Sequence, residues 1–312
     1  MTLIIHLGAP KTATSTLQGG FFPRHPGLVF LGKIVDERSG FTGWRSPELT
    51  RLMLALERTN LDFAPDRSEI AGIVAAIGAE AAGRPVVISS EDLCLFSAVD
   101  PFTKLARVTE LFGSLGPIRA ILAVREQLAL LRSIYLTEHR GEMLKLPGTS
   151  QAWYPDFDQY LDIHFRYAWG STLECFRFSA MIDRYERLLG SANILVYAFD
   201  DFARDPVAGL KLLCRFIGVQ EDGAFLEQSA ATHANRHYSQ RTYRYSAFLN
   251  RFSPSLGLSK FVPRVVVDAA RTWISAGDAV ELSPSPEARR RIAEYYRADN
   301  EELRRKHGIE LH

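Results

Sequence analysis

The stretch Leu3 to Gln18, LIIHLGAPKTATSTLQ, decides the fold because it joins a short apolar run to a cluster of hydroxyl side chains. The apolar part is bounded by Gly8 and Pro10, and a run of this length between turn residues is typical of a strand buried on both faces. The hydroxyls stand where a helix should begin, and there free backbone N–H groups and the helix dipole favour an anion. The stretch predicts a strand, a tight turn and a helix whose first turn holds an anion.

One lysine and the hydroxyls after it are the groups available to such an anion. Lys11 supplies a full positive charge on a flexible stem. The Walker A pattern of nucleotide P-loops, G-x-x-x-x-G-K-[ST], is not met, because position 13 holds alanine and position 14 holds threonine. In the structural alternative, the hydroxyls only cap the helix that follows the strand. The candidate binding residues are Lys11, Thr12, Ala13, Thr14, Ser15 and Thr16.

The segment Pro10 to Thr16, PKTATST, resembles the loop P-K-[ST]-G-[ST]-[ST] that holds the 5′-phosphosulfate in sulfotransferases that use 3′-phosphoadenosine 5′-phosphosulfate (PAPS). The chain departs from that pattern at Ala13, where the family usually has glycine. If the loop needs a positive φ there, alanine is strained; if the position is helical, alanine suits it better than glycine. The resemblance implies that Lys11 neutralises charge on the bridging oxygen. It also implies that Thr12 and the helix N-terminus hold the 5′-phosphate.

A second polar site follows another buried-type strand as the tetrad SSED, residues 89–92. Ligands of open α/β sheets bind outside the carboxyl ends of the strands, which makes Glu91 a candidate for chemistry. The tetrad also fits a capping box with Ser89 at the N-cap, and for Asp92 this structural interpretation is preferred. In the family that the loop resembles, a glutamate at a similar place often serves as general base. The resemblance therefore implies that Glu91 takes the acceptor proton.

A third polar pair follows the next buried-type strand. Arg125 stands at the strand end, and Ser133 lies eight residues later on the expected helix. A guanidinium grips phosphate with two parallel bonds, which suits arginine to this position. The R-x7-S spacing is similar to the 3′-phosphate site of the sulfotransferases and occurs on the expected element. In the alternative, Arg125 pairs with Glu126 or Glu138 and Ser133 has no ligand.

Two later segments extend the resemblance. FDDFARDPVAGLKLLCRFIGV, residues 199–219, is similar to a family stretch in which the residue at Asp200 is usually glutamate, and we expect Asp200 to cap the following helix. Pro206 is expected at a helix start. The donor-rich segment HANRHYSQR, 233–241, resembles the loop that closes over the 3′-phosphate and adenine, which implies roles for Arg236 and Ser239. A solvated loop is the alternative for this segment.

Composition narrows the classes of protein. The chain has 312 residues, 46% hydrophobic and 23% charged, with a formal net charge of +1, so bulk charge favours neither nucleic acid nor a membrane surface as partner. The cysteines Cys94, Cys175 and Cys214 are far apart and show neither a metal-binding spacing nor a disulfide framework. Neither a signal peptide nor an apolar window long enough for a transmembrane helix is evident. These features predict a cytoplasmic protein with reduced thiols.

Apolar strands alternate with amphipathic helices, which predicts an α/β three-layer sandwich with a central parallel sheet. The expected strands are 3–7, 28–31, 85–88, 118–124 and 193–197. The expected helices are 47–59, 67–82, 101–112, 127–140, 156–165, 178–189 and 287–306. The resemblance implies a P-loop NTPase-like sulfotransferase fold in a single domain, 1–312, with a variable acceptor-side region over 219–285.

The resemblance implies transfer of a sulfuryl group from PAPS to a hydroxyl or amine of a carbohydrate, lipid or small molecule. The product is 3′-phosphoadenosine 5′-phosphate (PAP), and no metal is expected. A P-loop kinase-like phosphotransferase remains an alternative, which would need Mg²⁺ and an acidic partner such as Asp92 or Asp200. A non-catalytic nucleotide-binding module is the other alternative, and it would not need Glu91. Aromatic residues that could meet the acceptor are Phe41, Trp44, Trp153 and Tyr154. His164 is expected to be structural.

Overall fold

The structure is a computed structural model. It describes residues 1–9, 11–32, 34–36, 41–60, 62–138, 156–166, 173–231, 239–241, 243–244, 278, 280 and 282–311. The chain divides into two compact units. The first comprises Met1–Glu126, Tyr167–Ala234 and Tyr296–His312, and the second comprises Gln127–Arg166 and Asn235–Tyr295. The expectations of one domain over 1–312 and of an acceptor-side region at 219–285 stay predictions.

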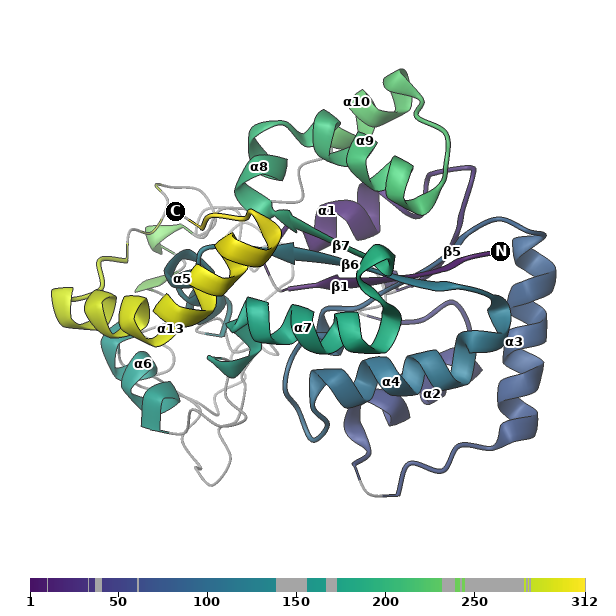
Figure 1. The fold of residues 1–312 in the computed structure, drawn as a ribbon, viewed down its shortest axis with the longest axis horizontal. Coiled ribbons are helices and arrows are strands. Elements are labelled where there is room, and N and C mark those ends of the chain that lie inside the picture. The colour runs from purple at the N-terminus through teal and green to yellow at the C-terminus, as the bar shows by residue number, and fades with distance from the viewer. Residues whose placement is uncertain are drawn as a thin grey trace, which may run out of the picture. The chain divides into compact units, whose positions relative to one another are not determined.

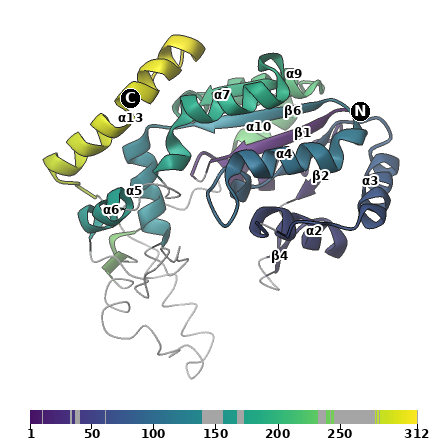
Figure 2. The same cartoon turned by 60° about the horizontal axis from the view of Figure 1, so that its bottom comes forward.

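The first unit is built on a five-stranded sheet in the order β2-β5-β1-β6-β7, and every pairing in it is parallel. The strands are β1 (Leu3–Gly8), β2 (Val29–Gly32), β5 (Val86–Ser89), β6 (Ile118–Val124) and β7 (Ile194–Ala198). All six residues of β1 are buried, as its apolar run predicts, and β1 lies beside β6 in both views (Figure 1 and Figure 2). The α/β class with a central parallel sheet is confirmed.

Helices cover both faces of this sheet. Their bounds are α1 (Thr14–Thr16), α2 (Pro47–Arg58), α3 (Arg67–Ala81), α4 (Pro101–Phe112), α7 (Phe178–Leu189), α8 (Phe199–Arg204), α9 (Pro206–Ile217) and α10 (Gly223–Ala231). One core cluster joins β1, β5 and β6 to the π-helical segment η1 (Leu17–Phe21), α9 and α10. On the other face lie α4 and α7 (Figure 1). The three layers of the predicted sandwich are therefore present.

Several helices of this unit begin with a side-chain N-cap followed by proline. Ser46, Asp100 and Asp205 each accept a hydrogen bond from a backbone N–H of the first turn, and each is followed by proline. Such a side chain satisfies one otherwise unpaired N–H, and proline needs no partner at the first helical position. Asp200 was expected to cap α9 and does not, because it lies within α8 and Asp205 stands at the helix start.

A short antiparallel pair, β3 (Ile34–Asp36) with β4 (Phe41–Gly43), lies between the predicted strand 28–31 and the predicted helix 47–59, where no strand was predicted. Trp44 follows it and is buried, and a Cβ added to Gly32 would lie 3.0 Å from the Trp44 ring. Trp44 is therefore a packing residue. Trp153 and Tyr154 lie outside the described residues.

In the second unit, α5 (Gln127–Glu138) packs against α6 (Phe157–Arg166) through aromatic rings. The Tyr135 ring centroid lies 5.3 Å from that of Tyr160, and the His164 ring lies 4.3 Å from Tyr160. Burial lowers the pKa of His164 to about 4, which keeps the ring neutral near pH 7. The ring packing agrees with a structural role for this histidine.

The last helix, α13 (Pro286–His307), contributes residues to both units. In the second unit, the Arg291 guanidinium lies 4.4 Å from the centroid of the Phe165 ring. In the first unit, Asp299 accepts bonds from the backbone N–H groups of Ser179 and Ala180 at the start of α7, each at 3.0 Å. None of the helices in the described part of the chain is long and apolar enough to cross a membrane.

Candidate functional site

The loop after β1 is shaped by two residues in the left-handed region, Lys11 at φ 66° and Ala13 at φ 63°. Thr12 and Thr14 are buried, and both hydroxyls donate to the carbonyl of Ala9, at 2.6 and 3.3 Å. These hydroxyls hold the loop in shape, so what Thr12 can offer a ligand is its backbone N–H. The exposed or half-exposed side chains of the loop are those of Lys11, Ala13, Ser15 and Thr16.

The loop returns closely over the end of β1. A Cβ added to Gly8 would lie 2.4 Å from Thr14 Oγ1 and 2.9 Å from His6 Cε1, so only glycine fits at this position. Ala13 is the N-cap residue of α1, and its carbonyl accepts from the N–H of Leu17 at 3.1 Å. The helix that starts here therefore presents its first N–H groups at the same edge of the sheet as the loop.

Alanine at position 13 would be strained at a positive φ and favourable in a helical conformation. The observed φ is positive, so Ala13 is strained. Ala13→Gly should raise the free energy of unfolding by about 1 kcal/mol, because an L-residue in the left-handed region clashes with its own carbonyl and glycine does not. Urea unfolding checks this. Ala55→Gly, in the middle of α2, is the matched control and should lower stability by about 1 kcal/mol. A destabilised Ala13→Gly variant would contradict the strain.

Arg125 lies at the end of β6 and reaches the loop. Its Nη1 donates to the carbonyl of Lys11 at 2.8 Å, and its guanidinium carbon lies 4.5 Å from the centroid of the Phe199 ring. Burial lowers the pKa of Arg125, and the charges of Asp200 and Glu126 oppose that shift. Two motifs that are far apart in the sequence therefore meet. Sequence reasoning missed Phe199, whose signal is an aromatic residue directly after a parallel strand.

Glu91 opens a single 3-10 turn, η2 (Glu91–Leu93), directly after β5. The residue that caps this turn is Ser90, whose hydroxyl accepts from the N–H of Asp92 at 3.3 Å. The prediction that Ser89 is the N-cap is wrong, because Ser89 is still the last residue of the strand. Glu91 thus stands at the carboxyl end of a strand beside β1, as predicted.

Ser89 belongs to a buried polar network that joins β5 to β1 and to the segment after the loop. Its hydroxyl lies 2.7 Å from His6 Nδ1, and Gln18 Nε2 donates to its Oγ at 3.0 Å and to its carbonyl at 3.2 Å. Burial lowers the pKa of His6 to about 3, so the ring is neutral at pH 7. Sequence reasoning missed His6, because it stands inside an otherwise apolar strand.

The lowered pKa of His6 predicts a loss of stability in acid. In the unfolded chain the His6 ring binds a proton below its ordinary pKa of 6.5, whereas in the folded chain it does so only near pH 3. The stabilisation from this residue is therefore complete above pH 6.5 and is lost as the pH falls. Between pH 6 and pH 4 the slope should be about 1.4 kcal/mol per pH unit from this residue. Urea unfolding of wild type and His6→Asn across this range measures it. Equal slopes in the two proteins would contradict the assignment.

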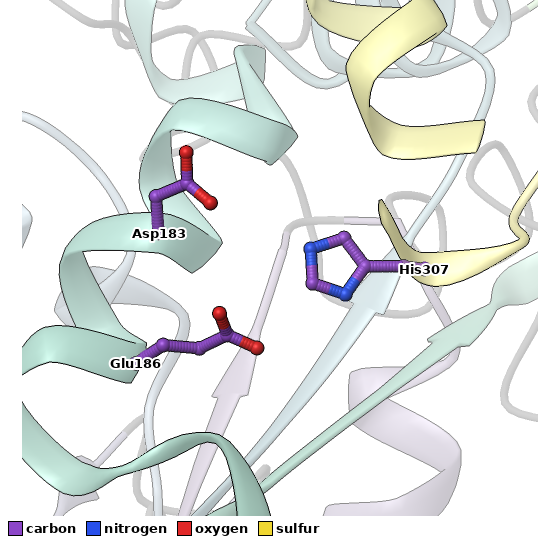
Figure 3. A group of neighbouring side chains, drawn as sticks. All are labelled: Asp183, Glu186 and His307. Atoms are coloured by element: carbon purple, nitrogen blue, oxygen red, sulfur yellow. The ribbon is translucent and has the colours of Figure 1, made fainter. Parts of the chain in front are cut away.

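A group that could hold a metal was found away from the loop, on α7 and α13. Ligand atoms of Asp183, Glu186 and His307 lie within 4.8 Å of one another, and Figure 3 shows both carboxylates turned toward the imidazole. All three side chains are only partly buried, and Lys306 Nζ already donates to Asp183 Oδ2 at 2.7 Å. Because the lysine supplies the positive charge here, we assign no metal to this group.

The remaining predicted residues belong to the second unit or lie outside the described residues. Ser133 lies in α5 of the second unit, and Ser239, which is buried, also belongs to that unit. Arg236 lies outside the described residues. The structure thus brings Lys11, Thr12 and Arg125 together in the first unit, while the roles of Ser133, Ser239 and Arg236 stay predictions.

No protein-family model matches the sequence, and no curated protein is similar to it in sequence. Among solved structures, a sulfotransferase from Alicyclobacillus acidocaldarius matches over 99% of this chain and 96% of its own, with 16% identity and a TM-score of 0.55. Mouse sulfotransferase SULT7A1, solved with PAP, matches over 98% of this chain and 84% of its own, with 14% identity and a TM-score of 0.46. On the first of these matches, together with the parallel sheet and its flanking helices, the chain has the sulfotransferase fold.

Proposed function

We propose that this chain is a sulfotransferase that moves a sulfuryl group from PAPS to a hydroxyl or amine of an acceptor. The observation that carries the proposal is the bond from Arg125 to the Lys11 carbonyl, at 2.8 Å, between residues 114 positions apart. It gathers an exposed ammonium, a half-buried guanidinium and the start of a helix at one edge of the sheet. A donor with phosphate groups at both its 5′ and 3′ ends suits such a pair of cations.

The loop binds the 5′ end of the donor in this proposal. Backbone N–H groups from Thr12 to Thr16 face the 5′-phosphate, helped by the exposed hydroxyl of Ser15. The buried hydroxyls of Thr12 and Thr14 keep the loop in shape through Ala9. Lys11 lies at the turn, where its ammonium stabilises the negative charge that develops on the oxygen between sulfur and phosphorus.

The 3′-phosphate is assigned to Arg125, which is held by the Phe199 ring and the charge of Asp200. Roles in 3′-phosphate binding are proposed for Ser133, Arg236 and Ser239 only from the resemblance of their segments to the family. The guanidinium already bonds a carbonyl of the 5′ loop, so binding at the two ends of the donor is linked through one side chain.

Glu91 is proposed as the general base. It removes the proton from the acceptor as the acceptor oxygen or nitrogen attacks sulfur, and the bond from sulfur to the bridging oxygen breaks to release PAP. Glu91 follows β5 and Lys11 follows β1, and these two strands are neighbours in the sheet. The acceptor is proposed to be a small molecule, lipid or glycan.

Incubation with PAPS and a panel of acceptors tests this proposal. The panel contains a phenol, an aliphatic alcohol, an amine and a monosaccharide, and the readout is formation of PAP with the matching sulfated product. Product with any of them supports sulfuryl transfer. Transfer of the γ-phosphate of ATP–Mg²⁺ to the same panel, with no product from PAPS, would support a phosphotransferase. If neither PAPS nor ATP–Mg²⁺ gives a product, the result would support a nucleotide-binding module without activity.

Arg125→Gln should lower affinity for PAP about 10- to 100-fold more than affinity for ADP, since a charged bond to phosphate contributes about 1.5–3 kcal/mol. ADP lacks the 3′-phosphate, so the ratio of the two affinities isolates that group, and titration calorimetry measures both. Arg119→Gln is the matched control, because Arg119 stands on the same strand and donates to the Phe216 carbonyl at 2.8 Å. Equal losses for PAP and ADP would contradict the 3′-phosphate assignment.

A further inference from the structure

Two charged side chains that the proposed reaction does not use lie buried next to the turn that carries Glu91. Lys104 in α4 is 0% exposed and Glu57 in α2 is 3% exposed. Both contact the segment from Ser90 to Leu95. Their contacts fall on residues on either side of the proposed base, Ser90 before it and Asp92 and Leu95 after it.

Lys104 holds the end of the turn. Its Nζ donates to the carbonyls of Asp92 and Leu95, each at 2.7 Å. These carbonyls are three residues apart, so one ammonium fixes the path of the chain between them. An ammonium has three donors and no acceptor, which suits it to gather carbonyl oxygens that the short helical turn leaves unpaired.

Glu57 holds the beginning of the turn. Its Oε1 accepts from the hydroxyl of Ser90 at 3.0 Å, and the same hydroxyl accepts from the N–H of Asp92 at 3.3 Å. The carboxylate therefore orients the hydroxyl that caps the turn. The backbone of Glu57 is tied to the same region, because Ser97 Oγ donates to its carbonyl at 2.8 Å.

Fold stability alone does not explain these two charges. Loss of water around the ammonium lowers the pKa of Lys104, and the charges of Glu57 and Asp92 only oppose this shift. Apolar residues of similar volume often serve a protein core as well as a buried charged pair does. What apolar residues could not do here is fix two backbone carbonyls and one hydroxyl in place.

The turn is also joined to the strand that leads into the donor loop. Cys94 Sγ donates to the carbonyl of Gly8 at 3.4 Å, and the N–H of Ser90 donates to the carbonyl of His6 at 3.4 Å. The backbone that carries Glu91 is thus held against the end of β1 as well as by the two buried charges.

We propose that Lys104 and Glu57 are positioning residues, which set the place of the Glu91 carboxylate relative to the donor loop. The inference rests on the proposed function, because it assigns them a role in proton removal by Glu91. A base displaced by about 1 Å can lose about 10²-fold in rate, so fixing the turn has a measurable effect on turnover.

Lys104→Met and Ser90→Ala test this in two ways. The first removes the ammonium and keeps the length of the side chain; the second removes the cap and the partner of Glu57 with little change in volume. Each is made in wild type and in Glu91→Gln. Turnover is measured as PAP formed from PAPS, with the fastest panel acceptor and with water alone. In wild type each should lower kcat about 10-fold while PAP affinity stays unchanged, and in Glu91→Gln neither should lower it further.

Arg119→Met is the matched control, since it removes a contact of the same kind, from a cation to the Phe216 carbonyl, and its turnover should match that of wild type. If the losses of Lys104→Met and Ser90→Ala multiply with that of Glu91→Gln, or if PAP affinity falls in step with kcat, the two residues act only on the fold and the inference is wrong. A wild-type protein that forms no PAP from PAPS would instead overturn the proposed function.

Discussion

Replacing Glu91 by glutamine should lower the turnover number for sulfuryl transfer by about 10²- to 10⁴-fold, the usual contribution of a general base. Glutamine has nearly the same shape but cannot accept the proton that the acceptor must lose. The affinity for PAP should stay unchanged, because Lys11 and Arg125, which are proposed to bind it, follow β1 and β6 and do not lie in η2. Steady-state kinetics and a PAP titration of the same preparation separate the two effects.

Asp92→Asn is the control for this substitution. Asp92 stands in the same turn, and its backbone N–H and carbonyl, which the variant keeps, bond to Ser90 and Lys104. Its variant should keep turnover close to that of wild type. Wild-type turnover in Glu91→Gln would remove Glu91 from the role of base, and an equal loss in both variants would show only that the turn had moved.

Replacing Lys11 by methionine should lower turnover by about 10²- to 10³-fold, the effect expected when one group that stabilises developing charge is removed. Methionine keeps an unbranched stem, so it meets the same backbone strain as lysine at φ 66°. Steady-state kinetics with PAPS and the fastest acceptor of the panel measure the loss.

Lys11→Arg separates charge from geometry. Arginine keeps the positive charge but presents it as a planar fork on a longer side chain, so partial recovery of turnover would show that charge is the main requirement. Wild-type activity in Lys11→Met would contradict the assignment of this lysine to the bridging oxygen. A misfolded variant would also lose activity. Its Tm and its binding of PAP are therefore measured as well, to distinguish misfolding from loss of catalysis.

The edge of the sheet at which the candidate site lies could be predicted from short stretches of sequence. An apolar run that ends in glycine predicts β1, and residues just after parallel strands lie at one edge of the sheet, where the structure has both Lys11 and Arg125. The same reasoning placed Glu91 correctly but assigned its cap to Ser89 and not to Ser90. Residues at strand ends are uncertain by one position from sequence, because the final residue of a strand and a cap share an extended backbone.

The buried residues that hold the site in place could not be predicted from the sequence, because each depends on contacts with distant elements. The spacing of Glu57 and Lys104 within amphipathic helices reads as ordinary surface charge, yet both side chains are buried. His6 stands in a strand whose pattern predicts apolar neighbours, and its partner Ser89 is 83 positions away. Periodicity predicts which face of an element is covered, but it does not identify the polar group that a distant element places there.

The measurement that tests the central claim most directly is the thermal stability of the protein with PAP, ADP and ATP–Mg²⁺ in parallel. A ligand at 100 times its Kd should add about 2.7 kcal/mol to the free energy of unfolding, which raises Tm by several degrees. Our account predicts that PAP raises Tm well above the value reached with equal concentrations of ADP or ATP–Mg²⁺. A rise with ATP–Mg²⁺ alone, or none with any of the three, would contradict it.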